Sequence, residues 1–267
     1  MNNCYASIGH VGKQEDIEIL ERILLHNYNV ISKFNYIVIY QNCGGSCENL
    51  LIDYNNVWKK IFGKDVIILP ASKNRGHTFG TMDCDNAVIE YSKTLPVDFV
   101  YKSANDILLD EQILQIPITN EYDFYFLQGI GFAGLQQFQY NINLYLKEYL
   151  TPEHFHPQTS FYIIRNHLDY LNNRTVVDAA YNKCQSISNY NGRAWEYVAD
   201  FSCEFFLRDS IKRNKFKYKH IISDDSFLKL LNAILQYKII DPSHKNIYFK
   251  ELGLCHLQYI NQPCLEI

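Results

Sequence analysis

Short apolar runs alternate with amphipathic segments through the first half of this 267-residue chain, and this alternation restricts the fold more than any other feature. The predicted strands are Cys4–Ile8, Tyr36–Tyr40, Val66–Leu69, Phe99–Tyr101 and Phe124–Leu127. Apolar side chains recur at helical spacing in the segments Glu15–Asn27, Glu48–Phe62 and Asp83–Ser92. Repeated strand–helix units are typical of a mostly parallel sheet that is covered by helices, so the sequence predicts an α/β fold.

Polar residues and glycines follow several of the predicted strands. Right-handed crossovers place the ends of parallel strands on one rim of a sheet, where ligands bind in open α/β folds. The residues expected to converge there are Ser7, Gly9, His10, Asn42, Asn74, Arg75, His77 and Asp106.

The second half of the chain is less regular. Its predicted helices are Leu135–Tyr149, Leu168–Leu171, Val176–Cys184, Trp195–Lys212 and Ser226–Gln236. Its predicted strands are Ser160–Ile164 and Phe216–Ile222. Because no repeat or Pro/Gly-rich linker interrupts the chain, we expect one domain over residues 1–267.

Composition excludes several classes of protein. The formal charge of −4 provides no basic surface for a nucleic-acid polymer. No apolar run reaches the roughly 18 residues of a membrane span, and the first residues do not resemble a secretory leader. The eight cysteines are scattered without a Cys-x-x-Cys pair, which favours free thiols in a reducing compartment. We therefore expect a soluble cytoplasmic protein.

The segment from Asn74 to Asp106 carries the strongest indication of a binding site. Gly76 lets the backbone approach a ligand closely, and Arg75 and His77 are candidates for contacts with a base or phosphates. Asn105 and Asp106 end a strand one helix later, where a carboxylate suits Mg²⁺ or Mn²⁺ bound to a diphosphate. The structural alternatives are an ordinary turn at Gly76 and an Asp that caps the turn after the strand.

Other acidic residues and histidines are candidates for catalysis or metal binding. On a helix over Trp195–Lys212, Glu196, Asp200 and Glu204 share one face, and one of them could accept a proton. Glu196 is nearest to the predicted helix start, while the alternative for all three is an exposed acidic face. His220 and His256 are each either a metal ligand from the C-terminal part or a buried structural histidine.

No P-loop, Gly-x-Gly-x-x-Gly, Gly-x-Ser-x-Gly or His-Glu-x-x-His motif occurs in the chain. The layout instead resembles the GT-A-fold glycosyltransferases, closest in style to the family 2 enzymes. The resemblance covers about Cys4–Phe132 well and Ser160–Ile222 loosely. The motifs that carry it are Ser7-Ile-Gly-His10, Gln41-Asn42, Asn74-Arg-Gly-His77, Asp83-Cys-Asp-Asn86, Ser103-Ala-Asn-Asp106 and Trp195-Glu196.

The resemblance implies a role for each matching residue. Ser7, Asn42 and Arg75 would hold the nucleoside, with Gly9, His10, Asn74, Gly76, His77 and Asn105 beside it. Asp85 and Asn86 would lie near the donor sugar. Asp106 would bind the divalent cation, with His220 as a possible second ligand. Glu196 would be the general base, with Glu204 and Asp200 as alternatives. Ala104 replaces the first acid of the family's Asp-x-Asp motif, and Gln41-Asn42 replaces an Asp at the second strand.

The resemblance also divides the expected domain into a nucleotide-sugar-binding half (1–132), an acceptor and catalytic half (133–222) and a C-terminal helical segment (223–267). It implies transfer of a sugar from a nucleotide-diphosphate donor to a glycan or other hydroxyl acceptor, with inversion in a single displacement. Two alternatives remain open. Gly9-His-Val-Gly-Lys13 partly fits the first loop of a nucleotidyltransferase, and the missing acid at Ala104 fits a degenerate domain that only binds glycans or proteins.

Overall fold

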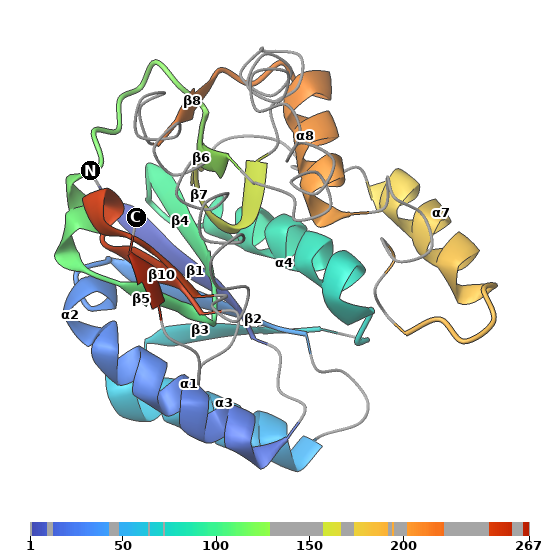
Figure 1. Cartoon of the computed structure of the whole chain (residues 1–267), viewed down its shortest axis with the longest axis horizontal. Coiled ribbons are helices and arrows are strands. Elements are labelled where there is room, and N and C mark those ends of the chain that lie inside the picture. Colours follow the sequence, from blue (N-terminus) through green and yellow to red (C-terminus); the bar gives the residue numbers. More distant parts are fainter. Residues whose placement is uncertain are drawn as a thin grey trace.

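The computed structural model describes residues 2–9, 13–42, 48–63, 65–71, 73–128, 157–166, 174–191, 194, 202–221, 246–257 and 264–266. Within these residues a seven-stranded sheet forms the centre of the molecule (Figure 1). Its strands, in spatial order, are β3 (Val66–Pro70), β2 (Tyr36–Gln41), β1 (Asn3–Gly9), β4 (Phe99–Ala104), β7 (Pro157–Arg165), β6 (Phe124–Gln128) and β8 (Tyr218–His220). All adjacent pairs are parallel except those of β7 with β4 and β6. The predicted α/β class with a mostly parallel sheet is confirmed.

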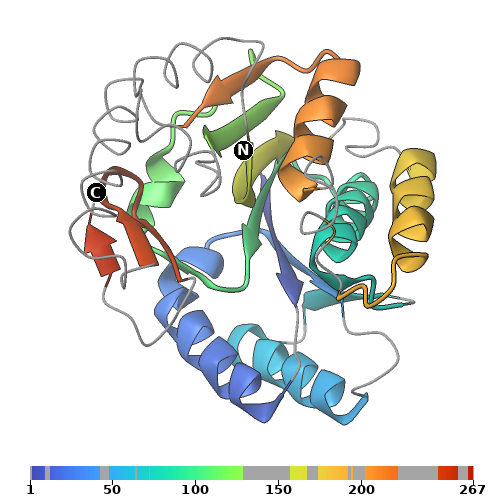
Figure 2. The same ribbon diagram turned by 45° about the vertical axis from the view of Figure 1, so that its right-hand side comes forward.

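Helices cover both faces of this sheet. On one face lie α1 (Gln14–His26), α2 (Tyr28–Ile31) and α3 (Glu48–Phe62). On the other lie α4 (Gly76–Ser92) and α8 (Cys203–Arg213), and α7 (Arg174–Gln185) packs against α4 (Figures 1 and 2). None of the helices in the described ranges combines the length and apolar character needed to cross a bilayer.

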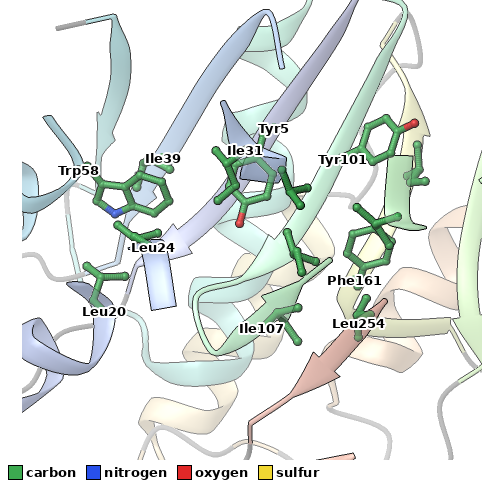
Figure 3. Close-up of a cluster of buried hydrophobic side chains, with 14 of the residues drawn as sticks. Tyr5, Leu20, Leu24, Ile31, Ile39, Trp58, Tyr101, Ile107, Phe161 and Leu254 are labelled. Carbon is green, nitrogen blue, oxygen red and sulfur yellow. The ribbon is translucent and has the colours of Figure 1, made fainter. Parts of the chain in front are cut away.

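Alternation along the strands divides the core between these two layers, because successive side chains of a strand point to opposite faces. Tyr5 and Ile39 pack towards α1 and α3, whereas Cys4, Ala6 and Val38 pack towards α4 and α8. Figure 3 shows the first cluster, where Trp58 from α3 and Leu24 from α1 meet the sheet.

A second sheet joins the C-terminal part of the chain to the segment after β4. Its described strands, in spatial order, are β11 (Cys264–Glu266), β9 (Asn246–Phe249), β10 (Leu254–His256) and β5 (Ile107–Leu109). The short 3-10 helices η1 (Glu111–Gln115) and η3 (Lys250–Leu252) lie next to it in the chain. Within 223–267, the described residues form the strands β9, β10 and β11 and the short helix η3, where the sequence suggested helix. The division of the chain into three segments stays a prediction. The predicted helix Ser226–Gln236 lies outside the described residues.

Most of the predicted elements of the first half are confirmed, and the largest shift of a boundary is at the start of α4. The helix predicted to begin at Asp83 begins at Gly76. Asn74 Oδ1 accepts a hydrogen bond from the Gly76 N–H at 2.9 Å, and Gly76 has a φ of 80°, which favours glycine. His77 and Gly80 therefore belong to the first turns of α4, ahead of the predicted helix start.

Candidate functional site

One edge of the main sheet gathers most of the predicted site residues. The parallel strands β1, β2, β3, β4 and β6 end there, and β7 begins there because it runs in the opposite direction. Gly9 ends β1, Asn42 follows β2, and the turn Asn105–Asp106 follows β4, so all of them lie at this edge. Ser7 is buried within β1, and His10 lies outside the described residues. The topology thus produces the predicted convergence, while ligand binding at this edge stays a prediction.

Close packing fixes the end of β2 against the start of α4. Asn42 Nδ2 donates a hydrogen bond to the Gly76 carbonyl at 3.1 Å. A Cβ on Gly80 would lie 1.8 Å from Asn42 Nδ2, so only glycine fits beside this amide. The buried Asn42 Oδ1 has no hydrogen-bond partner within the described part of the chain.

Gly80→Ala tests this packing. In an ordinary helix interior, replacing glycine by alanine stabilises a protein by about 1 kcal/mol. Here we expect the opposite sign, a loss of about 1–3 kcal/mol in the free energy of unfolding, because the methyl group displaces the Asn42 amide. Urea denaturation measures the change. Adding Asn42→Ala should recover part of the loss, and a stabilised Gly80→Ala single variant would contradict the contact.

Arg75 is held by groups on α4 and α7. Its Nη1 lies 2.6 Å from Asp178 Oδ1, and its Nε lies 3.2 Å from Asp83 Oδ2. The guanidinium also stacks 4.5 Å from the centre of the Tyr181 ring. Burial raises the pKa of Asp83 to about 6, partly opposed by Arg75. Arg75 therefore fixes α7 to α4 in this structure, and a nucleotide contact would require these interactions to rearrange.

Asp106 lies in the turn between β4 and β5, beside a histidine from the C-terminal part. Its Oδ2 is 3.5 Å from His256 Nε2, and its carbonyl accepts the Leu257 N–H at 2.9 Å. Pairing of β10 with β5 sets this distance, because His256 is opposite Ile107. Both side chains are partly exposed, so a ligand can reach them from solvent.

His220 occupies a different place from His256. It ends β8, where its ring centroid lies 4.6 Å from that of Phe126. Strands β6 and β7 separate β8 from β4, so at roughly 4.8 Å per strand His220 is distant from Asp106. His256 is the histidine that the fold brings to Asp106. Within the described ranges no group of three or more His, Cys, Asp or Glu side chains could hold a metal ion.

Asp85 and Asn86 lie inside the protein on α4, 1% and 3% exposed. Asp85 Oδ1 accepts a hydrogen bond from the Tyr162 hydroxyl at 2.6 Å and lies 3.5 Å from the buried Lys102 Nζ. Burial raises the pKa of Asp85, while Lys102 and Tyr162 oppose that shift. Asp85 is therefore part of a buried ion pair in this structure, and it does not face the open edge that a donor sugar would occupy.

The same buried network extends to Glu204. Lys102 Nζ donates to the Thr159 carbonyl, and Thr159 Oγ1 donates to Glu204 Oε1 at 2.8 Å. The Cys203 thiol donates to Glu204 Oε2 at 3.3 Å. Glu204 is partly exposed in the first turn of α8, where the N-terminal end of the helix favours a carboxylate.

The prediction of one continuous helix over Trp195–Lys212 is wrong. Ser202 has extended backbone angles (φ −88°, ψ 152°), and its hydroxyl caps α8 by accepting the Phe205 N–H at 3.2 Å. Glu204 therefore does not share a helix face with Glu196 and Asp200. These two residues lie outside the described part of the chain, and their roles stay predictions.

Sequence reasoning missed Lys102, Thr159, Tyr162 and Cys203. Lys102 carries a signal in the sequence, because a lysine inside an otherwise apolar strand must find a charged partner when buried. The other three are common residue types in strands and helices. Their participation depends on how β7 and α8 meet, which local sequence does not specify.

Comparisons with known proteins give little further information. No protein-family model and no curated protein sequence matches this chain. Among solved structures, an active-site mutant of LgtC matches at 9% identity and a TM-score of 0.43, covering 82% of this chain and 72% of that one. The galactosyltransferase LgtC in complex with donor and acceptor sugar analogues matches at 10% identity and 0.42, covering 82% and 73%. Similarity at this level does not establish an activity for this chain.

Proposed function

We propose that this protein transfers a sugar from a nucleotide-diphosphate donor to a hydroxyl acceptor at the carboxyl edge of its main sheet. One observation supports this above the rest: the fold brings a carboxylate–imidazole pair, Asp106 and His256, and a separately held carboxylate, Glu204, to that edge. The first pair suits a cation bound to phosphates, and the second group suits proton removal.

A divalent cation fits the chemistry of the first pair. Asp106 would supply a carboxylate oxygen, a ligand that suits Mn²⁺ or Mg²⁺, and His256 would supply an imidazole nitrogen, which suits Mn²⁺ better than Mg²⁺. Water or phosphate oxygens would provide the remaining ligands. When bound, such an ion would offset the negative charge on the leaving diphosphate. Asp106 and His256 would hold it in place at the strand end.

Glu204 would act on the acceptor. Its carboxylate is already fixed by donors to both oxygens, yet it remains partly exposed and can accept a proton from a hydroxyl group. Removing that proton while the oxygen attacks the anomeric carbon gives a single displacement with inversion. Holding both reactants at one edge would supply much of the rate, because the encounter becomes effectively unimolecular.

Donor binding tests the role of Asp106. We expect Mn²⁺ to strengthen the binding of a nucleoside diphosphate, measured by calorimetry over a panel of bases. Asp106→Asn should weaken this metal-dependent binding by at least about tenfold, because a charge-assisted contact contributes about 1.5–3 kcal/mol.

Asp110→Asn is a matched control. Asp110 also lies 3.5 Å from a histidine nitrogen, that of His26, but at the opposite end of β5. The Asp110 variant should bind nucleotide and Mn²⁺ like the parent. Equal metal-dependent binding by the Asp106 variant and the parent would contradict the metal role. Binding without transfer to any acceptor would instead support a domain that only binds glycans or nucleotides.

A further inference from the structure

Thr159 connects the buried ion pair of the core to the carboxylate at the site edge. Its carbonyl accepts a hydrogen bond from the Lys102 ammonium, and its hydroxyl donates a hydrogen bond to Glu204 Oε1 at 2.8 Å. Lys102 is in turn 3.5 Å from Asp85 Oδ1. Thr159 thus accepts a hydrogen bond from Lys102 through its backbone carbonyl and donates one to Glu204 on α8 through its hydroxyl.

An irregularity in β7 directs the Thr159 side chain towards α8. Phe126 is paired with Tyr162 and Gln128 with Pro157, so the register shifts within the interval that contains Thr159. In a regular strand, Thr159 would share a face with Phe161, which packs on the α1 and α3 side. Bulges of this kind redirect side chains and are common next to functional sites. Thr159 is buried and contacts Cys203 and Glu204, at the start of α8.

Among the described residues, Thr159 and Cys203 both donate hydrogen bonds to Glu204, and the Thr159 hydroxyl is the closer of the two, at 2.8 Å. Cys203 Sγ lies at 3.3 Å from Glu204 Oε2. The buried Lys102 is connected to Glu204 through Thr159, and the Glu204 charge also acts on the buried Asp85. Burial and the nearby Glu204 raise the pKa of Cys203, so the thiol keeps its proton and can donate. Arg208, one turn along α8, is paired with Asp209 at 3.2 Å.

We propose that Thr159 is a positioning residue that orients the Glu204 carboxylate as the proton acceptor of the reaction. Its hydroxyl occupies one lone pair of Oε1 and stabilises the ionised form, while the Lys102 contact keeps its backbone from moving. Cys203 restrains the second oxygen. This inference rests on the proposed function for the identity of the reaction, but the contact itself is testable without any substrate.

The first test is an NMR titration of the Glu204 side-chain carboxyl in protein labelled with ¹³C-glutamate, assigned with Glu204→Gln. Losing the hydroxyl in Thr159→Val should move the titration midpoint up by about one pH unit, because a hydrogen bond to the charged form is removed. Thr159→Ser keeps a hydroxyl and should titrate close to the parent. Thr81→Val is a matched control, since the Thr81 hydroxyl is buried on α4 but donates to the His77 carbonyl.

The second test uses the transfer reaction. In Thr159→Val we expect kcat to fall by about tenfold, the acid limb of the pH–rate profile to move to higher pH, and KM for the donor to stay unchanged. Thr159→Ser should restore the profile. A fall in kcat that serine does not rescue, or an unmoved acid limb, would overturn the positioning role.

The two tests separate this inference from the proposed function. An unchanged Glu204 midpoint in a folded Thr159→Val protein overturns the inference, whatever the enzyme does. A moved midpoint in a protein whose parent transfers no sugar from any nucleotide donor overturns the proposed function, and with it the role of Glu204 as a base.

Discussion

Lys102→Met is expected to destabilise the protein by about 3–5 kcal/mol, because it leaves the Asp85 carboxylate buried without its cation. Lys102 and Asp85 are each 1% exposed, so solvent cannot replace the lost partner. Methionine fills nearly the same volume as the lysine stem, which limits the contribution of an empty cavity. Urea denaturation of the parent and the variant measures the change in the free energy of unfolding.

The double variant with Asp85→Asn is the control for this effect. Removing both charges should cost less than removing Lys102 alone, since no unpaired charge remains. If the double variant is as unstable as the sum of the two single variants, the ion pair does not account for the loss.

The stability of Lys102→Met should also depend on pH in a defined direction. Burial raises the folded-state pKa of Asp85 and Lys102 opposes that shift, so removing Lys102 raises this pKa further and the folded variant binds the additional proton more readily. Stability must then fall as pH rises from about 4 through the raised folded-state pKa. The variant is therefore expected to be closest to the parent at the acidic end of that window, and a deficit that grows towards acid would contradict this assignment.

Glu204→Gln is expected to reduce kcat by about 10²–10⁴-fold, because glutamine cannot remove the proton of the attacking hydroxyl. Donor affinity should stay unchanged, since Glu204 lies on α8 and the proposed donor ligands Asp106 and His256 lie at β5 and β10. Steady-state transfer with the donor found by the binding panel, together with calorimetric affinity for that donor, gives both quantities.

Three further variants make this prediction specific. Glu90→Gln removes an exposed acid on α4 and should leave kcat as in the parent. Glu196→Gln and Asp200→Asn test the two other acids of the sequence prediction. If Glu204→Gln keeps full turnover and either Glu196→Gln or Asp200→Asn loses it, the general base is the residue whose substitution abolishes turnover.

The sequence predicted the sheet well because each strand has its own local signature. The helix Glu48–Phe62 is confirmed at both ends, and the strands β1, β2, β3, β4 and β6 are found within a few residues of their predicted positions. Apolar runs between helical segments can be recognised locally in the sequence. The right-handed crossover rule then predicts how consecutive parallel strands are connected. The convergence of strand ends on one edge follows from that rule alone.

The chemistry of the edge was less accessible to sequence reasoning. Asp106 was identified from its place after a strand, but its partner His256 became distinct from His220 only through the pairing of β10 with β5. The predicted alignment of Glu204 with two other acids is wrong because Ser202 caps the start of α8, and a serine can either cap a helix or lie within one. Asp85 was predicted to contact a sugar, whereas its environment depends on Lys102 from β4 and Tyr162 from β7.

The pairing of β10 with β5 has a consequence for how this protein acquires its site. Asp106 and His256 lie far apart in the chain and meet only when β10 has docked on β5. A partly folded chain with its first strands and helices in place still has only one of the two side chains at the edge. An ion that needs both would therefore bind late in folding and would favour the completed chain over its intermediates.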